Sequence, residues 1–360
     1  MTRAAVCRRF GAPLQIEDIE VGAAGPGEVR VRMVATAICH SDITYVDGGW
    51  GGDLPAVYGH EGAGVVEQIG SEVTSVGIGD HVVVTLIRSC GHCHGCTMGV
   101  PVTCDTTFSL DKNSPIRDAQ GVALVHGLRT GAFAETTVVH ESQVVRVPPD
   151  LQLDVASLLA CGVITGVGAV TNTARVEVGS DVVVFGCGGV GLNSVQGALL
   201  AGARSIIAID LADSKLAAAT VFGATHVVNA RAADLIDQVR AITGDRGADY
   251  VFVTVGAKAA FDASYALLAK GGAVVLVGMP PSGVFSEIDP GTLAGYNQRI
   301  LGSKMGGSRI AIDIPHLVTL YQQGRLKLDE LISGRFPLED INAAIASVKS
   351  GEALRNVIVF

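Results

Sequence analysis

The sequence predicts an α/β protein of two domains, one rich in β-strands and one built on a doubly wound parallel sheet. Three observations lead to this prediction. Short Val-rich runs punctuated by glycine fill the first 160 or so residues, strand-like and helix-like runs alternate from Ser180 onward, and a glycine-rich turn opens the second pattern. A chain of 360 residues accommodates two domains, and 48% apolar against 17% charged residues allows a large buried core.

The first domain is expected to consist mainly of short strands. Typical runs are VRVRMVAT (29–36), GAGVVEQIG (62–70) and DHVVVTLI (80–87), which suit strands separated by turns. Pro148 and Pro149 then interrupt this pattern, and residues 151–174 predict a helical connection.

The second pattern alternates between the two kinds of element. Strands are predicted at DVVVF (181–185), SIIAID (205–210), THVVN (225–229), DYVFVTV (249–255), AVVLVG (273–278) and RILGSK (299–304). Helices are predicted over 189–201, from about 213, before 249 and over 261–269. Short apolar strands with helical crossovers indicate a parallel sheet covered on both faces. From about 308 two helical stretches follow, and 356–360 predicts a last strand.

The charge and hydropathy of the chain argue against some classes of function. Lys and Arg total 26 and Asp and Glu total 35, so the formal charge is −9. A general nucleic-acid binder needs a basic surface, so we expect no nucleic-acid partner. No apolar run reaches the roughly 18 residues of a membrane span, and the start MTRAAVCRRF has no secretory apolar core. We therefore expect no membrane association and a cytoplasmic protein.

Four clustered cysteines predict a metal site. They are Cys90, Cys93, Cys96 and Cys104, in the spacing C-x2-C-x2-C-x7-C. Four thiolates this close in sequence can enclose one tetrahedral Zn²⁺, although the spacing also resembles an iron–sulfur loop. Zinc is favoured, and His92 and His94 within the loop are interpreted as solvated residues.

A glycine motif predicts a dinucleotide site. The run Gly186-Cys187-Gly188-Gly189-Val190-Gly191 follows a predicted strand, opens a predicted helix and matches G-x-G-x-x-G. Its glycines allow a tight turn, close approach of a pyrophosphate and close packing of helix on strand. Asp210 ends the next strand, where an acid binds both ribose hydroxyls and repels a 2′-phosphate, so NAD is favoured over NADP. Lys215, one helical turn further on, is a second candidate for the ribose; the alternative for Asp210 is a helix N-cap.

Three further residues form a candidate catalytic metal set. Cys39, His60 and Cys161 are far apart in sequence, so spacing alone does not assemble them. Two thiolates and one imidazole leave a tetrahedral zinc with an open position, as catalytic zinc sites have. For each residue alone, a buried thiol or a core histidine is an equally good interpretation.

With these motifs in place, the sequence resembles the zinc-dependent alcohol dehydrogenases of the medium-chain dehydrogenase/reductase superfamily along essentially its whole length. The resemblance is carried by Cys39-His40-Ser41-Asp42, Gly59-His60-Glu61, the four cysteines, Cys161 with Thr165-Gly166, the glycine motif and Asp210. It implies a GroES-like catalytic domain (1–162 and 304–360) with a structural-zinc lobe at about 88–106, and an NAD-binding Rossmann domain (163–303). It also implies that Cys39, His60 and Cys161 bind a catalytic zinc and that the four clustered cysteines bind a structural zinc.

The resemblance assigns roles around the catalytic zinc. Zinc acts as a Lewis acid while a hydride passes from the alcohol to NAD. Asp42 matches the residue that orients the zinc-binding histidine, and Glu61 matches a carboxylate near the metal. Ser41 matches the hydroxyl that contacts the alcohol and begins a proton relay. Many relatives end this relay at a histidine, but Thr44 stands at that position here.

Further roles concern the cofactor and the alcohol. By resemblance His40 and Arg355 contact the pyrophosphate and Thr165 touches the nicotinamide. Trp50 and Leu86 match the alcohol pocket, and both are apolar. The implied substrate is a hydrophobic or aromatic primary alcohol, and the implied assembly is a homodimer, with a homotetramer as the alternative.

Three other functions remain open from the sequence. The first is an S-(hydroxymethyl)glutathione dehydrogenase, although its usual acid and Arg are replaced here by Trp50 and Phe108. The second is a non-catalytic NAD-binding protein on the same fold, which would have no need of an open zinc site. The third is a zinc-independent enoyl or quinone reductase, a group that lacks both metal sets.

Overall fold

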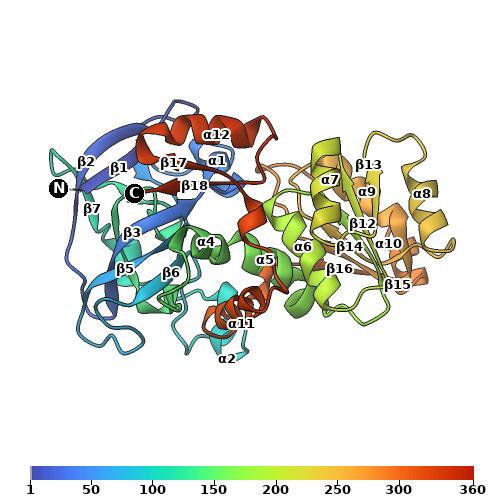
Figure 1. The fold of residues 1–360 in the computed structure, drawn as a ribbon, viewed down its shortest axis with the longest axis horizontal. Coiled ribbons are helices and arrows are strands. Elements are labelled where there is room, and N and C mark those ends of the chain that lie inside the picture. Colours follow the sequence, from blue (N-terminus) through green and yellow to red (C-terminus); the bar gives the residue numbers. More distant parts are fainter. Residues whose placement is uncertain (1) are drawn as a thin grey trace. The chain divides into compact units, whose positions relative to one another are not determined.

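A computed structural model describes residues 2–360, and the chain divides into two compact units (Figure 1). The first unit comprises the chain up to Gly162 together with Arg309–Phe360, and the second is Val163–Ser308. The second boundary lies after Ser308 rather than after 303, because the short helix η7 (Lys304–Gly307) packs within the second unit. There the backbone of Gly306 lies against Gly168, and the Ser308 hydroxyl donates to the carbonyl of Ile164 at 3.2 Å.

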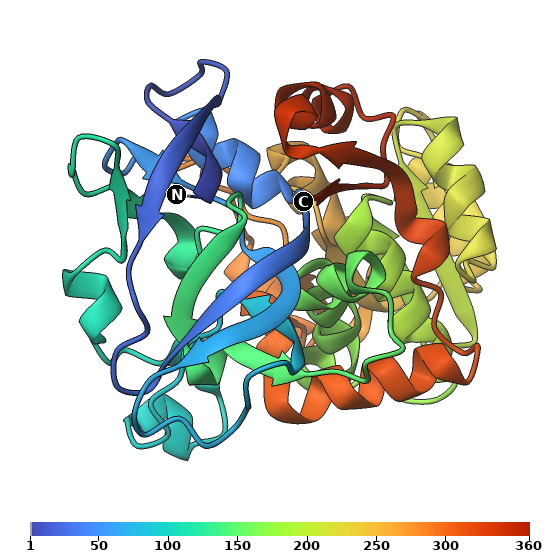
Figure 2. The same cartoon turned by 60° about the vertical axis from the view of Figure 1, so that its left-hand side comes forward.

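The first unit contains two β-sheets, one of five and one of seven strands, as predicted for a β-rich domain (Figure 2). The five-stranded sheet has the order β7-β2-β1-β4-β8; the other has the order β10-β6-β5-β3-β18-β17, with β9 paired to β3. The bounds are β1 Thr2–Cys7, β2 Gln15–Val21, β3 Glu28–Ala37, β4 Ala56–Val57, β5 Glu61–Ile69, β6 His81–Thr85, β7 Ile116–Asp118, β8 Val125–His126, β9 Thr136–His140, β10 Val144–Arg146, β17 Ile332–Pro337 and β18 Arg355–Val359.

Strand register brings four segments to one edge of the seven-stranded sheet. Glu61, the first residue of β5, pairs with Ala37 at the end of β3 and with Thr85 at the end of β6. Strand β18, from the C-terminal part of the chain, joins the same edge because Val357 also pairs with Ala37. The residues at these strand ends therefore gather together: Cys39, His60, Leu86 and Arg355.

The first unit also contains α-helices. They are α1 His40–Val46, α2 His94–Thr97, α3 Ser109–Lys112, α4 Leu153–Ser157, α11 Ile310–Gln322 and α12 Ile341–Lys349. Helix α12 buries Ile341, Ala344, Ile345 and Val348, the i, i+3, i+4, i+7 stripe of an amphipathic helix, in the core shared with β1 and α1. The two helical stretches predicted after 308 are thus confirmed.

The helix predicted over 151–174 is broken into pieces. Helix α4 continues as the 3₁₀ turn η4 (Leu158–Ala160), and after Cys161 come α5 (Gly162–Gly168) and the π-helical segment η5 (Ala169–Ala174). Cys161 has non-helical dihedral angles of φ −145° and ψ −66°, so the break lies at the predicted metal ligand. Within residues 2–360 no single helix is long and apolar enough to cross a membrane, although Leu153–Ala160 and Gly162–Ala174 pass together as a bent pair on length and composition.

The second unit is the predicted doubly wound parallel sheet. Its strand order is β13-β12-β11-β14-β15-β16, and every pairing is parallel. The bounds are β11 Asp181–Phe185, β12 Ser205–Asp210, β13 His226–Asn229, β14 Ala248–Val253, β15 Leu268–Leu276 and β16 Arg299–Gly302, with helices α6 Gly189–Leu200, α7 Asp213–Val221, α8 Leu235–Ile242, α9 Lys258–Ser264 and α10 Pro290–Gly295. With β11 as the first strand, this is the 3-2-1-4-5-6 order of the Rossmann fold.

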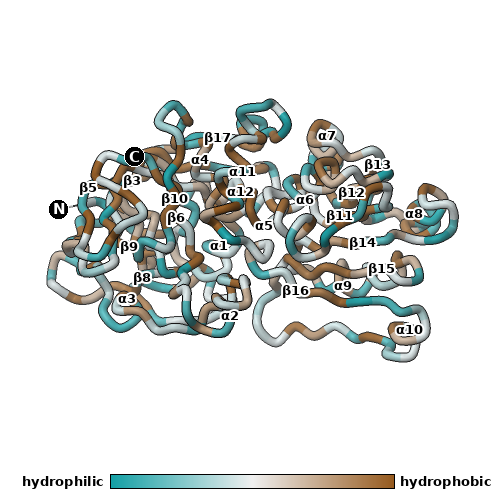
Figure 3. Tube along the Cα trace, turned by 90° about the horizontal axis from the view of Figure 1, so that it is seen from below, coloured by the Kyte–Doolittle hydropathy of each residue, from teal (hydrophilic) through white to brown (hydrophobic). Residues whose placement is uncertain are grey.

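Alternate residues of these strands face opposite layers of helices. Val183 and Phe185 of β11 share a core with Val239 of α8 and Phe261 of α9. Helices α6 and α7 cover the other face (Figure 1), and the central strands form a mainly apolar layer (Figure 3). The helix predicted over 261–269 is wrong at its end, because the apolar run from Leu268 begins β15 and pairs with β14.

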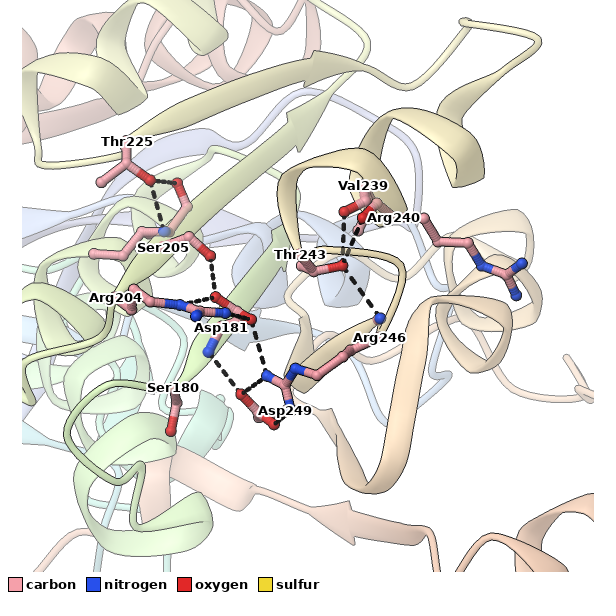
Figure 4. Close-up of polar contacts among 12 residues, drawn as sticks. Ser180, Asp181, Arg204, Ser205, Thr225, Val239, Arg240, Thr243, Arg246 and Asp249 are labelled. Carbon is pink, nitrogen blue, oxygen red and sulfur yellow. Dashed lines mark hydrogen bonds and ion pairs between the residues drawn. The ribbon is translucent and has the colours of Figure 1, made fainter.

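A polar network ties together the amino ends of three of these strands (Figure 4). The carboxylate of Asp181 is fully buried and accepts hydrogen bonds from the Ser205 hydroxyl at 2.6 Å and from the guanidinium groups of Arg204 and Arg246. Asp249 accepts from the Asp181 amide at 2.8 Å and also pairs with Arg246. The network therefore joins β11, β12 and the start of β14 at the edge opposite the glycine motif.

Candidate metal and dinucleotide sites

The structure brings together three predicted metal ligands and one neighbouring acid in the first unit. The side-chain donor atoms of Cys39, His60, Glu61 and Cys161 all lie within 4.8 Å of one another, and all four residues are buried. Cys39 follows β3, His60 precedes β5, and Cys161 lies at the helix break. The strand register brings His60 and Glu61 to Cys39, and Cys161 joins them from the helix break.

The His60 ring is oriented by Asp42. Its Nδ1 atom lies 2.8 Å from Oδ1 of Asp42, while the Asp42 carboxylate also accepts the backbone N–H groups of Gly59 at 3.1 Å and Cys39 at 3.0 Å. The other ring nitrogen, Nε2, is buried without a hydrogen-bond partner in the described chain. A buried imidazole nitrogen left free beside two thiols is the arrangement that a metal ion satisfies.

Neighbouring groups shift the pKa values of Cys39, Cys161 and His60. The Cys161 thiol acts as hydrogen-bond donor to Cys39, which lowers the pKa of Cys39 well below its usual value and raises the pKa of Cys161. Burial disfavours a charged His60, but the Asp42 carboxylate outweighs it and raises the pKa of His60. Since thiolates are the form that binds metal, the neighbours of Cys39 prepare it for this role.

Glu61 of this cluster forms a buried hydrogen-bonded pair with Arg355. Nη2 of Arg355 donates to Oε2 of Glu61, and Oε1 of Glu61 is buried without a partner in the described chain. Burial raises the pKa of Glu61 to about 8, although the charge of Arg355 opposes this rise. Arg355 is only 5% exposed and lies against Gly162, so its predicted contact with a pyrophosphate stays a prediction.

The donor set fits Zn²⁺. Two thiols, an imidazole and one carboxylate are typical zinc ligands, and a site with three strong protein ligands leaves a position for substrate. Cys39, His60 and Cys161 would hold the ion, with the Glu61 carboxyl near them.

The four clustered cysteines also converge. The sulfur atoms of Cys90, Cys93, Cys96 and Cys104 lie within 4.8 Å of one another around the short helix α2. A hydrogen bond from Thr106 lowers the pKa of Cys90 to about 5. His92 and His94 are exposed, as predicted for solvated residues. Four sulfur donors close a tetrahedral site without an open position, which fits a structural zinc.

The glycine motif in the second unit has the geometry of a dinucleotide-binding turn. Gly186 has φ +90°, and a Cβ atom there would lie 2.2 Å from Val255. A Cβ atom on Gly191 would lie 1.7 Å from the Gly186 carbonyl oxygen, so strand and helix can meet only with glycine here. At Gly188, the N-cap of α6, a Cβ atom would meet nothing within 4 Å, which leaves room for a phosphate at the helix N-terminus.

Asp210 closes this turn. Its carboxylate accepts the backbone N–H of Cys187 at 2.7 Å and that of Ala212 at 3.0 Å. Burial and the charge of Asp210 raise the pKa of the Cys187 thiol to about 12, so Cys187 stays neutral. Asp210 therefore supports the glycine turn in addition to its predicted contact with a ribose.

The remaining cofactor residues fall in both units. His40 and Arg355 belong to the first unit, whereas Thr165, the glycine motif, Asp210 and Lys215 belong to the second. The Thr165 hydroxyl lies 3.7 Å from the sulfur of Met305, a residue in the left-handed region at φ 49°. The tight contacts of Gly166 with α6 explain why small residues follow Thr165.

Ser41 and Thr44 lie on α1, directly after Cys39. The Thr44 hydroxyl donates to the carbonyl of His40 at 2.9 Å, so it is engaged within its own helix. The indole of Trp50 meets the ring of Tyr45 edge-on at 5.1 Å, and Tyr45 stacks on Tyr58 at 5.6 Å. This row of three rings ends two residues before His60 and was not predicted, because its pairing depends on the loop after α1.

Comparison with known proteins gives two family matches. The chain matches the alcohol dehydrogenase GroES-like domain over residues 25–149 and the zinc-binding dehydrogenase domain over residues 189–322. It is 37% identical over 370 residues to S-(hydroxymethyl)glutathione dehydrogenase of Saccharomyces cerevisiae, covering 99% of this chain and 95% of that protein.

Solved structures extend this likeness over the whole chain. An alcohol dehydrogenase zinc-binding domain protein from Burkholderia ambifaria has a TM-score of 0.95 at 39% identity, covering 100% of this chain and 98% of that one. Benzyl alcohol dehydrogenase from Acinetobacter calcoaceticus has a TM-score of 0.93 at 32% identity, covering 100% and 99%. With two metal-ligand clusters and a dinucleotide-binding turn, this chain belongs to the zinc-dependent alcohol dehydrogenases of the medium-chain dehydrogenase/reductase superfamily.

Proposed function

We propose that the protein oxidises a hydrophobic or aromatic primary alcohol to its aldehyde, reversibly and with NAD. The convergence of Cys39, His60 and Cys161, with a buried and unpartnered Nε2 on His60, carries this proposal. A non-catalytic NAD-binding protein has no need of such a cluster, and a zinc-independent reductase lacks it.

The chain's own residues prepare the reaction. When bound, zinc supplies a Lewis acid that favours loss of the alcohol proton, and NAD accepts the hydride. Asp42 fixes the ring of His60, and Ser41 receives the alcohol proton. Because Thr44 is bonded within α1 and is no base near neutral pH, water would have to carry the proton onward from Ser41.

The apolar pocket residues favour an aromatic substrate. Trp50, supported by Tyr45 and Tyr58, offers a flat apolar surface, and Leu86 is half-buried beyond the end of β6. The likeness to benzyl alcohol dehydrogenase is consistent with this class. The second candidate, oxidation of S-(hydroxymethyl)glutathione, is favoured by the 37% identity to a relative of that name. Trp50 and Phe108 weaken it, because they offer no charge to the anionic adduct.

Asp210 supports the choice of NAD. Its carboxylate ends β12 beside the glycine turn, where a second negative charge on a 2′-phosphate would be repelled. The cysteines form no disulfide bond within residues 2–360, which favours a reducing compartment such as the cytoplasm.

A homodimer through the second unit is the assembly that the surface favours, with a homotetramer as the alternative. Strand β16 is the last strand of its sheet. The chain before it exposes large apolar side chains, with Met279 65%, Phe285 82% and Tyr296 47% exposed. Sedimentation equilibrium of the wild type and of Phe285→Asp tests this assembly, since the charge is expected to dissociate it.

A substrate panel tests the function. Benzyl alcohol, ethanol and S-(hydroxymethyl)glutathione are compared with NAD and with NADP, alongside zinc counted per chain. We expect two zinc ions, preference for benzyl alcohol and preference for NAD. Cys161→Ala is expected to remove one zinc and all activity, and Ser41→Ala to lower kcat far more than NAD affinity. Full activity without zinc would contradict the proposal.

A further inference from the structure

We propose that Arg88 is a positioning residue that fixes the Leu86 wall of the alcohol pocket and couples it to the four-cysteine lobe. This inference rests on the proposed function, because Leu86 borders an alcohol only if the metal cluster oxidises one. Arg88 is not proposed as a metal ligand. It acts through the chain segments that it holds in place.

Arg88 is unusual because it is a buried charged residue. Its side chain is completely buried, although it lies between the exposed cysteine lobe and the end of β6. A buried guanidinium is tolerated only when its donors are paired. Three groups accept them: Oε1 of Gln143 at 2.7 Å, Oδ1 of Asp111 at 2.9 Å and the carbonyl of Arg129 at 3.2 Å.

On one side, Arg88 closes the base of the four-cysteine lobe. Arg88 precedes Cys90 by two residues, and Asp111 follows Cys104 by seven, so their ion pair joins the two chain segments that flank the cysteines. The guanidinium also lies 5.3 Å from the ring of Phe108, another residue after Cys104.

On the other side, Arg88 is linked to the edge that carries the catalytic cluster. Gln143, which is fully buried, donates from its amide to the carbonyls of Thr85 and of Arg129, both at 2.9 Å. Thr85 pairs with Glu61, so Leu86 and His60 are the next residues beyond that pair on the two strands. The Thr85 hydroxyl accepts the N–H of Ile87 at 2.8 Å, which shapes the turn through Leu86.

The same groups hold a strained turn. Leu128 and Arg129 have φ values of 53° and 62°, a left-handed conformation that is unfavourable for non-glycine residues. Arg88 and Gln143 both bind the Arg129 carbonyl and compensate this cost. With Arg88 removed, we expect the turn and the Leu86 segment to loosen together, since both depend on one guanidinium–amide pair.

The test compares four substitutions in the zinc-loaded enzyme, one of which, Arg88→Lys, keeps the charge. Arg88→Met removes all three polar contacts of the guanidinium. Gln143→Leu removes the bonds to Thr85, Arg129 and Nε of Arg88 but leaves the Arg88–Asp111 ion pair. Asp111→Asn weakens that ion pair and the longer contact of Asp111 with Arg129 at 3.7 Å. Arg146→Met, at an exposed arginine ending β10, is the matched control. Amide hydrogen exchange of residues 84–89 and 127–131 is measured with KM and kcat for benzyl alcohol, ethanol and NAD.

We expect Arg88→Met and Gln143→Leu to raise KM for benzyl alcohol on the order of 10-fold, because a pocket wall misplaced by a fraction of an ångström loses its contacts with the ring. KM for ethanol and for NAD stays within about 2-fold, since neither reaches this wall. Amide hydrogen exchange of residues 84–89 and 127–131 becomes faster. Asp111→Asn loosens residues 106–112 with little change in KM, and Arg88→Lys restores part of the selectivity.

Two results would overturn the inference. One is a fall in kcat/KM by the same factor for both alcohols, which indicates a general packing defect. The other is unchanged exchange in 84–89 when Arg88 or Gln143 is replaced. If Arg88→Met does not fold, Gln143→Leu and Arg88→Lys decide the matter. If the wild type oxidises neither alcohol, the proposed function fails, and hydrogen exchange still tests whether Arg88 holds these segments.

Discussion

Nδ1 of His60 lies 2.8 Å from Oδ1 of Asp42, and both side chains are completely buried. One contact therefore fixes the imidazole ring while its other nitrogen remains available beside two thiols. The Asp42 carboxylate also binds the amides of Gly59 and Cys39, so it holds the backbone on both sides of the cluster.

The first prediction concerns this carboxylate. Asp42→Asn should lower affinity for the catalytic zinc by about 10–100-fold, because the amide orients the ring less strongly and adds no charge to it. Chelator competition, followed with zinc counted per chain, measures the loss; the four-cysteine zinc should remain. Asp47→Asn, an exposed position at the end of α1, serves as control and should retain both ions. Equal retention of zinc in the two variants would refute this role.

The parallel sheet was predictable because its strands are short, apolar and separated by helices of ordinary length. Asp181–Phe185 and Ser205–Asp210 have the bounds that the sequence predicts. Strand β17 was missed because Ile332–Pro337 contains Gly, Arg and Pro, and because its residues alternate between half-buried and exposed without any that is fully buried.

The metal cluster was predictable only through the family resemblance. Nothing local in the sequence places Cys161 or His60 beside Cys39. The pairing of β5 with β3 brings His60 there, and Cys161 joins them at the helix break after Ala160. The Glu61–Arg355 pair depends on β18 joining β3, a contact between residues nearly 300 positions apart. Long-range strand pairing of this kind leaves no periodic signal in either segment.

The second prediction concerns cofactor choice. Asp210→Asn should raise the ratio of kcat/KM with NADP to that with NAD on the order of 10-fold, because it removes the charge that repels a 2′-phosphate. The amide can still accept the N–H of Cys187, so the glycine turn is kept. Steady-state kinetics with both cofactors measure the ratio. Asp213→Asn, at the start of α7, is the control and should leave it unchanged. A ratio equal to that of the wild type would count against Asp210 as the selective residue.

The third prediction concerns stability in mild acid. Burial lowers the pKa of His126, on β8, to about 4 from an ordinary value of 6.5, so the folded protein binds the proton less readily than the unfolded chain. Its contribution to stability is complete above pH 6.5 and falls as the pH drops toward 4. Between pH 6.5 and 5 the free energy of unfolding should fall by about 2 kcal/mol through this group alone.

His126→Asn is expected to remove this part of the pH dependence. Urea denaturation of the variant and the wild type at several values between pH 5 and 7 compares the two slopes. His316→Asn, at an exposed position of α11, should keep the slope of the wild type. Parallel slopes for His126→Asn and the wild type would show that His126 titrates alike in both states.

The last prediction concerns the network at the amino edge of the parallel sheet. Burial opposes ionisation of Asp181, but hydrogen bonds from Arg204, Ser205 and Arg246 outweigh it and lower the pKa of Asp181. Asp181→Asn should therefore reduce the free energy of unfolding by about 2–4 kcal/mol at pH 7, because Arg246 loses a charged partner and a buried acceptor is weakened.

The sign of its pH dependence follows from the lowered pKa. The stabilisation by Asp181 is complete above the ordinary carboxylate pKa of 3.8 and is lost as the pH falls through the lower value in the folded state. The difference between Asp181→Asn and the wild type in urea denaturation should hence be constant from pH 7 to about 5 and shrink in stronger acid. Asp237→Asn, at an exposed position on α8, should change stability by less than about 0.5 kcal/mol. If Asp181→Asn were no more destabilising than Asp237→Asn, the carboxylate of Asp181 would not be needed to hold the three strands together.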